Sequence, residues 1–258
     1  MNVRELWEYR DLVRFFVTRD IKGRYRQMAL GPLWIVMGPL LNMLLYTIIF
    51  GQVAKLPSDG IPYPVFIYSA LLPWTFFSAV LMAASNSLLG YKDLISKVYF
   101  PRLAIPVAGV VSAFVDFLFS FLILLGMMAF YGYWPGSTLL LASIPLLLAA
   151  LVGLGIGLWW ASWIVHYRDL ATVLGYIVRV WMFASPVVYA AGFVPEKWLW
   201  LYRLNPLTNV IEMFRWAILG TGRFSLGMVA VSFVIAGLLV VSGAYYFRRT
   251  ERNIVDIA

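Results

Sequence analysis

The chain has 258 residues, of which 62% are hydrophobic and 12% charged, and its mean hydropathy is +0.84. A soluble domain is about 45–50% apolar and about 25% charged, so this composition excludes a water-soluble globule and a disordered chain. The absence of cysteine excludes a disulfide-stapled domain, thiol catalysis and thiolate metal sites. The net charge of +8 does not indicate a nucleic-acid partner, because the basic residues flank apolar segments and are better explained as topology marks and contacts to lipid headgroups.

Residues 1–31 predict an amphipathic helix in the membrane surface. One face carries cations, and the opposite, apolar face consists of Leu6, Tyr9, Leu12, Val13, Phe16 and Val17. Such a helix turns its cations toward anionic headgroups. Two interpretations remain open, a simple interfacial anchor and a gate at the cytoplasmic mouth of a channel. The segment has no long apolar core of the cleavable kind, so it does not read as a signal peptide.

Six stretches reach the ~20 mostly apolar residues that a spanning helix needs. They are 33–54, 65–89, 103–131, 139–165, 174–193 and 226–247. Prolines within them are tolerated in a bundle, because neighbouring helices satisfy the freed backbone groups. We therefore predict an all-α polytopic membrane protein with six transmembrane helices. It forms one domain over 1–258, since no internal repeat or low-complexity linker divides the chain.

The distribution of charge predicts the orientation. Fourteen of the twenty Lys and Arg residues lie on one side of the predicted spans, in the segments 1–31, 90–102, 166–172 and 248–258, and five lie on the other side. The positive-inside rule then places both termini in the cytoplasm. An even number of spans agrees with two termini on the same side.

The first cytoplasmic loop, at 91–100, mixes apolar and charged residues at near-helical spacing before Pro101 ends any helix. It either packs back onto the membrane or presents an apolar face to a cytoplasmic partner. The last outer segment predicts two short amphipathic helices at 196–204 and 206–219, with Asn205 as a cap and Pro206 in the first turn. Either they dip into the outer leaflet as a re-entrant hairpin, or they lie on the interface as an aromatic belt.

Two charges fall inside predicted spans, Asp116 in the third and Arg179 in the fifth. A charge in the membrane is costly unless it is paired or faces a cavity. We therefore expect an Asp116–Arg179 ion pair inside the bundle. Such a pair either holds two helices in register or belongs to the transport path.

The sequence lacks the motifs of several enzyme classes. None of its five lysines follows a glycine, so the phosphate-binding Gly-Lys-Ser/Thr signature is absent. With a single histidine, His166, a paired-histidine zinc motif is impossible, and no acidic cluster lies at the inner end of a span. We expect no catalytic residues, no metal site and no bound cofactor on this chain.

Aromatic residues occur deep inside the predicted spans, and their faces pack well against the C–H faces of sugars. Core or lipid packing explains them equally simply, and the alternative is a path lined with ring faces for a long polymer. The candidates for such a path are Tyr46, Phe50, Trp74, Phe76, Phe77, Trp181, Phe183 and Tyr189.

Six short motifs follow one another along nearly the whole chain. They are Arg24-Tyr25 with 30–34, then 72–78, 97–106, Tyr167-Arg168-Asp169, 185–189 and Asn205-Pro206-Leu207. In these motifs the sequence resembles the membrane subunits of ABC-2 type polysaccharide exporters, in particular the O-antigen exporter permeases of lipopolysaccharide biosynthesis. Teichoic-acid and capsule exporters are related families.

The resemblance implies a homodimer in the bacterial inner membrane, joined to two cytoplasmic ATPase subunits that bind ATP and Mg. It implies a gate helix within 1–31 and an outer gate hairpin at 196–219. Arg24 and Arg26 are expected to meet the pyrophosphate of a lipid-linked polysaccharide. The expected coupling helix, which would dock on the ATPase, contains Tyr91, Lys92, Asp93, Leu94, Ile95, Lys97, Val98, Tyr99 and Phe100.

Two other functions remain open from the sequence. The first is an ABC-2 type exporter of another cargo, such as teichoic acid, capsule, a lipid or a drug. The second is a membrane enzyme or scaffold that needs no ATPase. A soluble P-loop subunit bound to the chain would distinguish the second function from the exporters.

Overall fold

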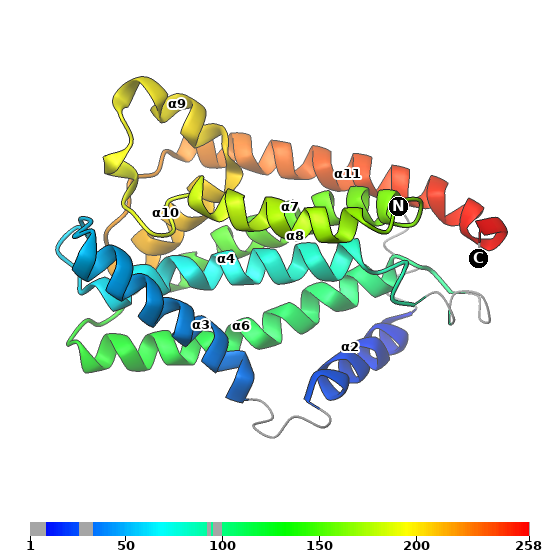
Figure 1. The fold of residues 1–258 in the computed structure, drawn as a ribbon, viewed down its shortest axis with the longest axis horizontal. Coiled ribbons are helices and arrows are strands. Elements are labelled where there is room, and N and C mark those ends of the chain that lie inside the picture. Colours follow the sequence, from blue (N-terminus) through cyan, green and yellow to red (C-terminus); the bar gives the residue numbers. More distant parts are fainter. Residues whose placement is uncertain (1–8, 26–32, 92–93, 95–99, 258) are drawn as a thin grey trace.

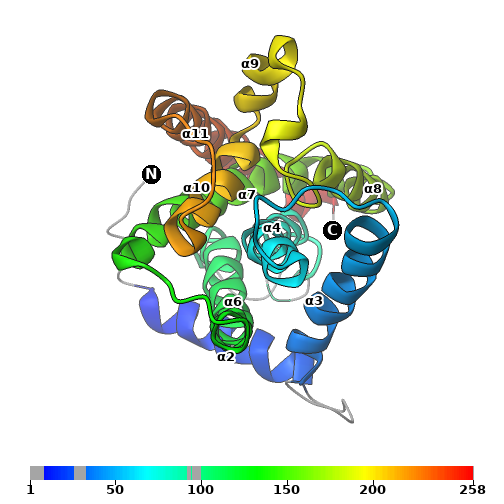
Figure 2. The ribbon, with the colours of Figure 1, turned by 90° about the vertical axis from the view of Figure 1, so that its left-hand side faces the viewer.

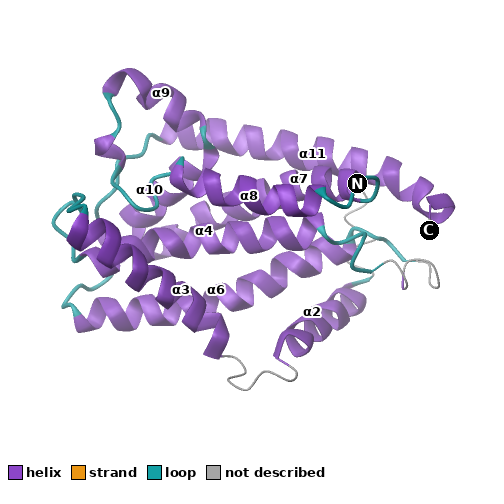
Figure 3. Cartoon of the chain, viewed as in Figure 1, coloured by secondary structure: helices purple, strands orange, loops and turns teal. Residues whose placement is uncertain are grey.

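The computed structural model describes residues 9–25, 33–91, 94 and 100–257, and this part of the chain is helical without strands (Figures 1 and 3). The elements are α2 (Arg10–Tyr25), α3 (Leu33–Tyr46), the π-helix η1 (Thr47–Val53), α4 (Tyr63–Ser85), α6 (Ala104–Phe130), the 3-10 helix η2 (Ser137–Ala142), α7 (Ser143–Ile164), α8 (Leu170–Phe183), the 3-10 helix η3 (Ala191–Phe193), α9 (Glu196–Leu204), α10 (Pro206–Leu219) and α11 (Leu226–Ile257). The predicted all-α fold class is confirmed.

Four helical stretches in the described part are long and apolar enough to cross a membrane. They are Tyr63–Ser85, Ala104–Phe130, Ser137–Ile164 and Leu226–Glu251, and they agree with four of the predicted spans to within a few residues at most ends. Two shorter apolar stretches, Met37–Val53 and Leu170–Phe183, fall in the first and fifth predicted spans. The chain is therefore a multi-pass membrane protein.

The helix predicted over 174–193 differs most from the structure. Helix α8 ends at Phe183, and turns follow as far as Ala190. Pro186 explains the early end, because proline lacks an N–H and its ring clashes with the preceding turn. The 14 residues of α8 extend ~21 Å, less than the ~30 Å of a hydrocarbon core.

Helix α4 forms the centre of the bundle, and Figure 2 shows it surrounded by α3, α6, α7, α8 and α10. Most of its side chains are buried, as expected for a helix that is apolar on every face. Small residues allow close approach at its partner α7, where a Cβ on Gly157 would lie 2.5 Å from the Cβ of Ala84. Helix α7 packs equally closely on α11 through Gly155 and Gly243.

Helix α2 and the last turns of α11 lie at the same end of the bundle, opposite α9 (Figure 1). A second apolar cluster ties this end together, with Phe16 of α2, Phe100, the start of α6 and Phe247 of α11. Arg102 also donates a hydrogen bond to the carbonyl of Glu251. Helix α2 and the end of α11 thus pack together at one end of the bundle (Figure 1).

We predict that Gly155→Leu destabilises the bundle. A Cβ at Gly155 would lie 2.8 Å from the backbone of Leu239 and Val240, so a larger side chain forces α7 and α11 apart at a cost of ~1–3 kcal/mol. The midpoint of thermal unfolding in mild detergent should fall. Gly237→Leu is the matched control on α11, because nothing lies within 4 Å of its Cβ position. Equal midpoints for the two variants would contradict the packing described here.

Candidate functional site

The segment between α8 and α11 forms the most unusual part of the structure. The two helices predicted at 196–204 and 206–219 are confirmed as α9 and α10 with these bounds. Helix α10 lies among α4, α7, α11 and η2, and eleven of its fourteen residues are buried. Helix α9 has no buried residue and exposes Trp198 and Trp200. An interfacial position therefore fits α9 but not α10.

Asn205 fixes the corner between α9 and α10. Its Oδ1 accepts the backbone N–H of Leu207 at 3.1 Å, which caps α10, and the indole N–H of Trp181 at 3.2 Å. Its Nδ2 donates to the hydroxyl of Ser185 at 3.0 Å. The 185–189 and 205–207 motifs, separated in sequence, are thus joined by a single side chain. Gly220 ends α10 in the left-handed conformation, with φ of 70°.

A buried ion pair lies on α10. The Arg215 guanidinium lies 3.4 Å from the Glu212 carboxylate, and the two residues are 1% and 4% exposed. Arg215 also donates to the carbonyl of Val187 at 3.0 Å, and its Cζ lies 3.7 Å from the centroid of the Phe66 ring. The second carboxylate oxygen of Glu212 accepts the backbone N–H of Arg223 at 2.8 Å. The pair therefore joins α10 to α4 and to the loops on both sides.

Sequence reasoning missed this pair and counted Arg215 as a charge on the outer side. The signal was present, because Glu212 and Arg215 are three residues apart on a helix that is otherwise largely apolar. Two opposite charges at that spacing lie on the same face of a helix. A short amphipathic helix beside the membrane does not by itself reveal whether that face is buried.

The structure does not bring Asp116 and Arg179 together, so the predicted ion pair within one chain is wrong. Arg179 is exposed on α8, with its Cζ 5.8 Å from the ring of Tyr176. Asp116 lies on α6, and α4 lies between α6 and α8 (Figure 2). The central position of α4 is the physical reason, because it keeps the two helices apart.

The predicted path aromatics fall into separate groups. Trp74 and Phe77 of α4 each contact Trp181 of α8, with ring centroids 6.5 and 5.4 Å apart. Tyr46 lies beside this cluster, with its ring 5.9 Å from that of Phe50 and its hydroxyl 3.9 Å from the sulfur of Met182.

Three of the predicted path aromatics lie apart from this cluster. Phe76 lies toward α6 and contacts Phe117 at 5.6 Å, so it does not share a surface with Phe77. Phe183 is exposed, and Tyr189 accepts a hydrogen bond from Tyr202 of α9 at 3.1 Å. Burial and this bond raise the pKa of the Tyr202 hydroxyl above its usual value.

The two ends of the predicted coupling helix lie against α2. The Tyr91 hydroxyl donates to Asp20 at 2.5 Å, and Arg19 lies over its ring with Cζ 4.1 Å from the centroid. Burial and the Asp20 carboxylate raise the pKa of the Tyr91 hydroxyl, so it remains a donor at neutral pH. Phe100 is buried 5.5 Å from the ring of Phe16, and Leu94 packs on the same cluster.

Several predicted site residues fall outside this description. Helix α2 includes Arg24, whose side chain is not described. The residues that lie outside the described part of the chain are Arg26, Lys92, Asp93, Ile95, Lys97, Val98 and Tyr99.

The structure has apolar helices of spanning length that pack around the central helix α4, and the short helix α10 is buried among them (Figure 2). This arrangement is that of a multi-pass membrane protein. The profile of the ABC-2 type transporter family matches residues 11–219, and the chain belongs to that family. It is 31% identical over 257 residues to the O-antigen export system permease protein RfbA of Myxococcus xanthus, covering 96% of each chain.

Two further relatives extend the comparison. The chain is 27% identical to the O-antigen export system permease protein RfbA of Klebsiella pneumoniae, over 96% of this chain and 95% of the relative. It is 25% identical to the polysialic acid transport protein KpsM of Escherichia coli, over 78% of each chain. These relatives are transport proteins, and their similarity to the chain extends beyond any single motif.

We predict that Arg215→Met destabilises the protein strongly. Removing one partner leaves the Glu212 carboxylate buried without its cation, which costs ~3–5 kcal/mol. The double variant Glu212→Gln/Arg215→Met should recover much of this loss, because glutamine keeps an acceptor for the N–H of Arg223. The midpoint of thermal unfolding measures both changes.

The control for this prediction is Lys197→Met, since Lys197 is an exposed cation on α9. Its midpoint should match that of the unaltered protein. A double variant that unfolds at or below the temperature of the single variant would contradict the pairing.

Proposed function

We propose that the chain is the transmembrane subunit of an ATP-driven exporter that moves lipid-linked polysaccharide, in particular O-antigen, across the bacterial inner membrane. The observation that carries this proposal is the similarity to O-antigen export permeases over 96% of the chain. Because the match extends through α9 and α10, it includes the proposed outer gate as well as the helices packed around α4. The buried helix α10 at one end, and the contacts of Tyr91 and Phe100 with α2 at the other, support this proposal.

We infer that ATP and Mg bind a separate partner, since no lysine in the sequence follows a glycine. Residues 91–100 then form the coupling helix between partner and bundle. The contacts of Tyr91 and Phe100 with α2 support this role, because a displacement at that segment pushes directly on α2 and the start of α6. Helix α2 acts as the gate helix at the cytoplasmic mouth, with both termini on that side.

We infer that two copies of the chain form the polymer path. Helices α3 and α8 lie side by side (Figure 2), and this face exposes apolar side chains, among them Leu44 of α3, Ile48 of η1 and Val180 of α8. The Trp74–Phe77–Trp181 cluster lies directly beneath them. A second copy across these faces would bury them and place ring faces from both chains along one path. With α3–η1 and α8 counted as spans, each copy has six.

The outer hairpin 196–219 then closes the far end of the path. Asn205 and the Glu212–Arg215 pair hold α10 against α8 and the 184–190 turns, so these elements move together. A capsule-type cargo is the second candidate, because the chain is also similar to a polysialic acid transport protein over 78% of its length. Both candidate cargoes are polysaccharides, and the same proposed gate would serve either.

Purification from native membranes tests the proposed partnership. We expect a stoichiometric soluble subunit with a P-loop to remain bound to the tagged chain in mild detergent. Tyr91→Ala removes the hydrogen bond to Asp20 and should lower the yield of that subunit. A chain that purifies alone, or with proteins that lack a P-loop, would contradict the exporter and favour a membrane enzyme or scaffold.

Arg24 and Arg26 test the proposed route of the cargo. Replacing both with glutamine removes two guanidinium groups that can bind a pyrophosphate, so export should fall while the chain remains in the membrane. The readout is polysaccharide at the cell surface, normalised to the amount of the chain. Lys55→Gln, a cation on the far side, is the control and should leave export unchanged. Full export by the double variant would remove these arginines from the route.

A further inference from the structure

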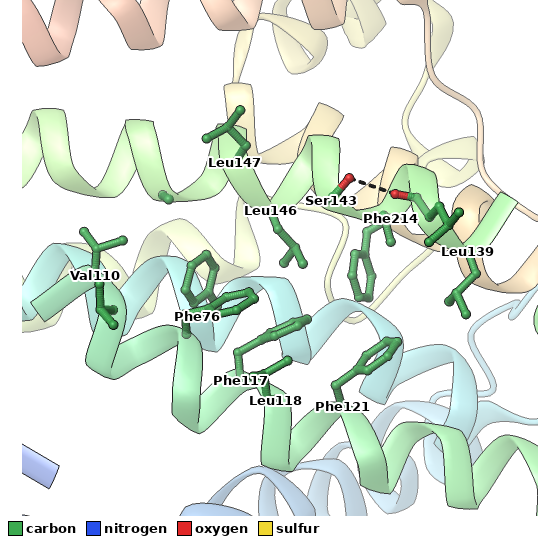
Figure 4. Close-up of a pocket in the computed structure, with 15 residues that line it drawn as sticks. Phe76, Val110, Phe117, Leu118, Phe121, Leu139, Ser143, Leu146, Leu147 and Phe214 are labelled. Atoms are coloured by element: carbon green, nitrogen blue, oxygen red, sulfur yellow. Dashed lines mark hydrogen bonds between the residues drawn. The ribbon is translucent and has the colours of Figure 1, made fainter. Parts of the chain in front are cut away.

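An apolar groove lies between α6 and α7, where several of the lining side chains are exposed (Figure 4). Its volume is about 610 Å³. The two helices form its walls, and Phe76 of α4 and Phe214 of α10 contribute its floor. Nothing in the proposed transport path uses this face, which lies across α4 from α3 and α8 (Figure 2).

The α6 wall is one continuous stripe. Its lining residues recur at helical spacing along a single face, and they are Val110, Val111, Phe114, Phe117, Leu118 and Phe121. Among the lining side chains, Ser143 alone is polar, and its hydroxyl donates to the carbonyl of Leu140 at 2.7 Å (Figure 4). The groove therefore offers a ligand no free hydrogen-bonding side chain, and it suits a hydrocarbon chain.

The groove continues toward α2. A second hollow of about 380 Å³ lies between α2 and the start of α6, and Val111 lines both. Arg10 and Arg14 line this hollow at its α2 side. Arg14 pairs with the exposed Asp11 at 3.3 Å, yet α2 as a whole carries five cations and two acids. An apolar groove that leads to the basic helix α2 complements a molecule with an anionic headgroup and an apolar tail.

The groove and the second hollow together are long enough for one acyl chain of a phospholipid. They follow α6 from Val107 to Phe121, ~21 Å along the helix, and the chains of one leaflet extend ~15 Å. Arg10 and Arg14 lie near the end of α2 opposite Arg24, ~21 Å and ~15 Å away from it along the helix. An anion at Arg10 and Arg14 is therefore separate from the proposed position of the cargo pyrophosphate.

We propose that this groove is a binding site for one anionic phospholipid of the cytoplasmic leaflet. Its phosphate lies at Arg10 and Arg14, and one acyl chain follows the α6 stripe to Phe214. This inference uses the orientation proposed above but not the identity of the cargo. The bound lipid joins α2, which contacts the coupling segment, to α10, whose Phe214 lies one residue from Arg215.

Photo-crosslinking tests the acyl-chain position. The full chain, with the subunits that purify with it, is placed in nanodiscs of phosphatidylethanolamine that contain phosphatidylglycerol with a diazirine on one acyl chain. Mass spectrometry should find the label on Val111, Leu118 and Leu147. Val111→Trp or, if that variant does not purify, Leu147→Trp fills the groove and should remove the label. Leu238→Trp, on the exposed face of α11, should leave it unchanged.

A second arm tests the headgroup. Phosphatidylglycerol should label the groove more than a phosphatidylcholine probe of the same chain length, and Arg10→Gln/Arg14→Gln should abolish this preference. Three results would overturn the proposal. These are equal labelling by both probes, labelling of α11 as strong as that of the groove, and displacement of the phosphatidylglycerol probe by added lipid-linked polysaccharide. The last result would identify the cargo as the occupant without affecting the proposed transport function.

Discussion

The architecture depends on placing a charged helix inside an apolar bundle. In hydrocarbon, charges and backbone polar groups must find partners within the protein. Helix α10 meets this requirement through the Glu212–Arg215 pair. Arg215 also donates a hydrogen bond to the carbonyl of Val187, and Glu212 accepts one from the N–H of Arg223. The irregular chain at 184–190 is tolerated for the same reason, since Tyr63 donates to the carbonyl of Val188 at 2.6 Å. Without α10, the carbonyl of Val187 and the N–H of Arg223 would lose these partners.

Contacts between helices connect the two ends of the bundle that the proposed transport cycle uses. At one end, α2 contacts both Tyr91 and Phe100, so motion of the coupling segment reaches the start of α6. At the other end, Asn205 joins α8 to α10, and the ion pair joins α10 to α4. Helix α4 packs against both α6 and α8, so it connects the two ends of the proposed cycle.

Much of the fold is predictable from the sequence, because it follows from chain length, apolar runs and helix-ending residues. Asn205-Pro206 begins α10 as predicted, and Gly220 ends it in the left-handed conformation. The pairing of charges was not predictable in this way. Asp116 and Arg179 are both in apolar helices, but only the position of α4 between them shows that they do not meet. Phe76 and Phe77 are adjacent in sequence, yet ~100° of helical turn sends them to different neighbours.

The central claim is that this chain supplies the path through which ATP drives a polysaccharide. It is tested most directly in inverted membrane vesicles that contain the chain, its ATPase partner and lipid-linked O-antigen. On addition of ATP, polysaccharide should become protected inside the vesicles from an added glycosidase, and vesicles without the chain should show no protection. Protection that is independent of ATP, or that persists without the chain, would contradict the account.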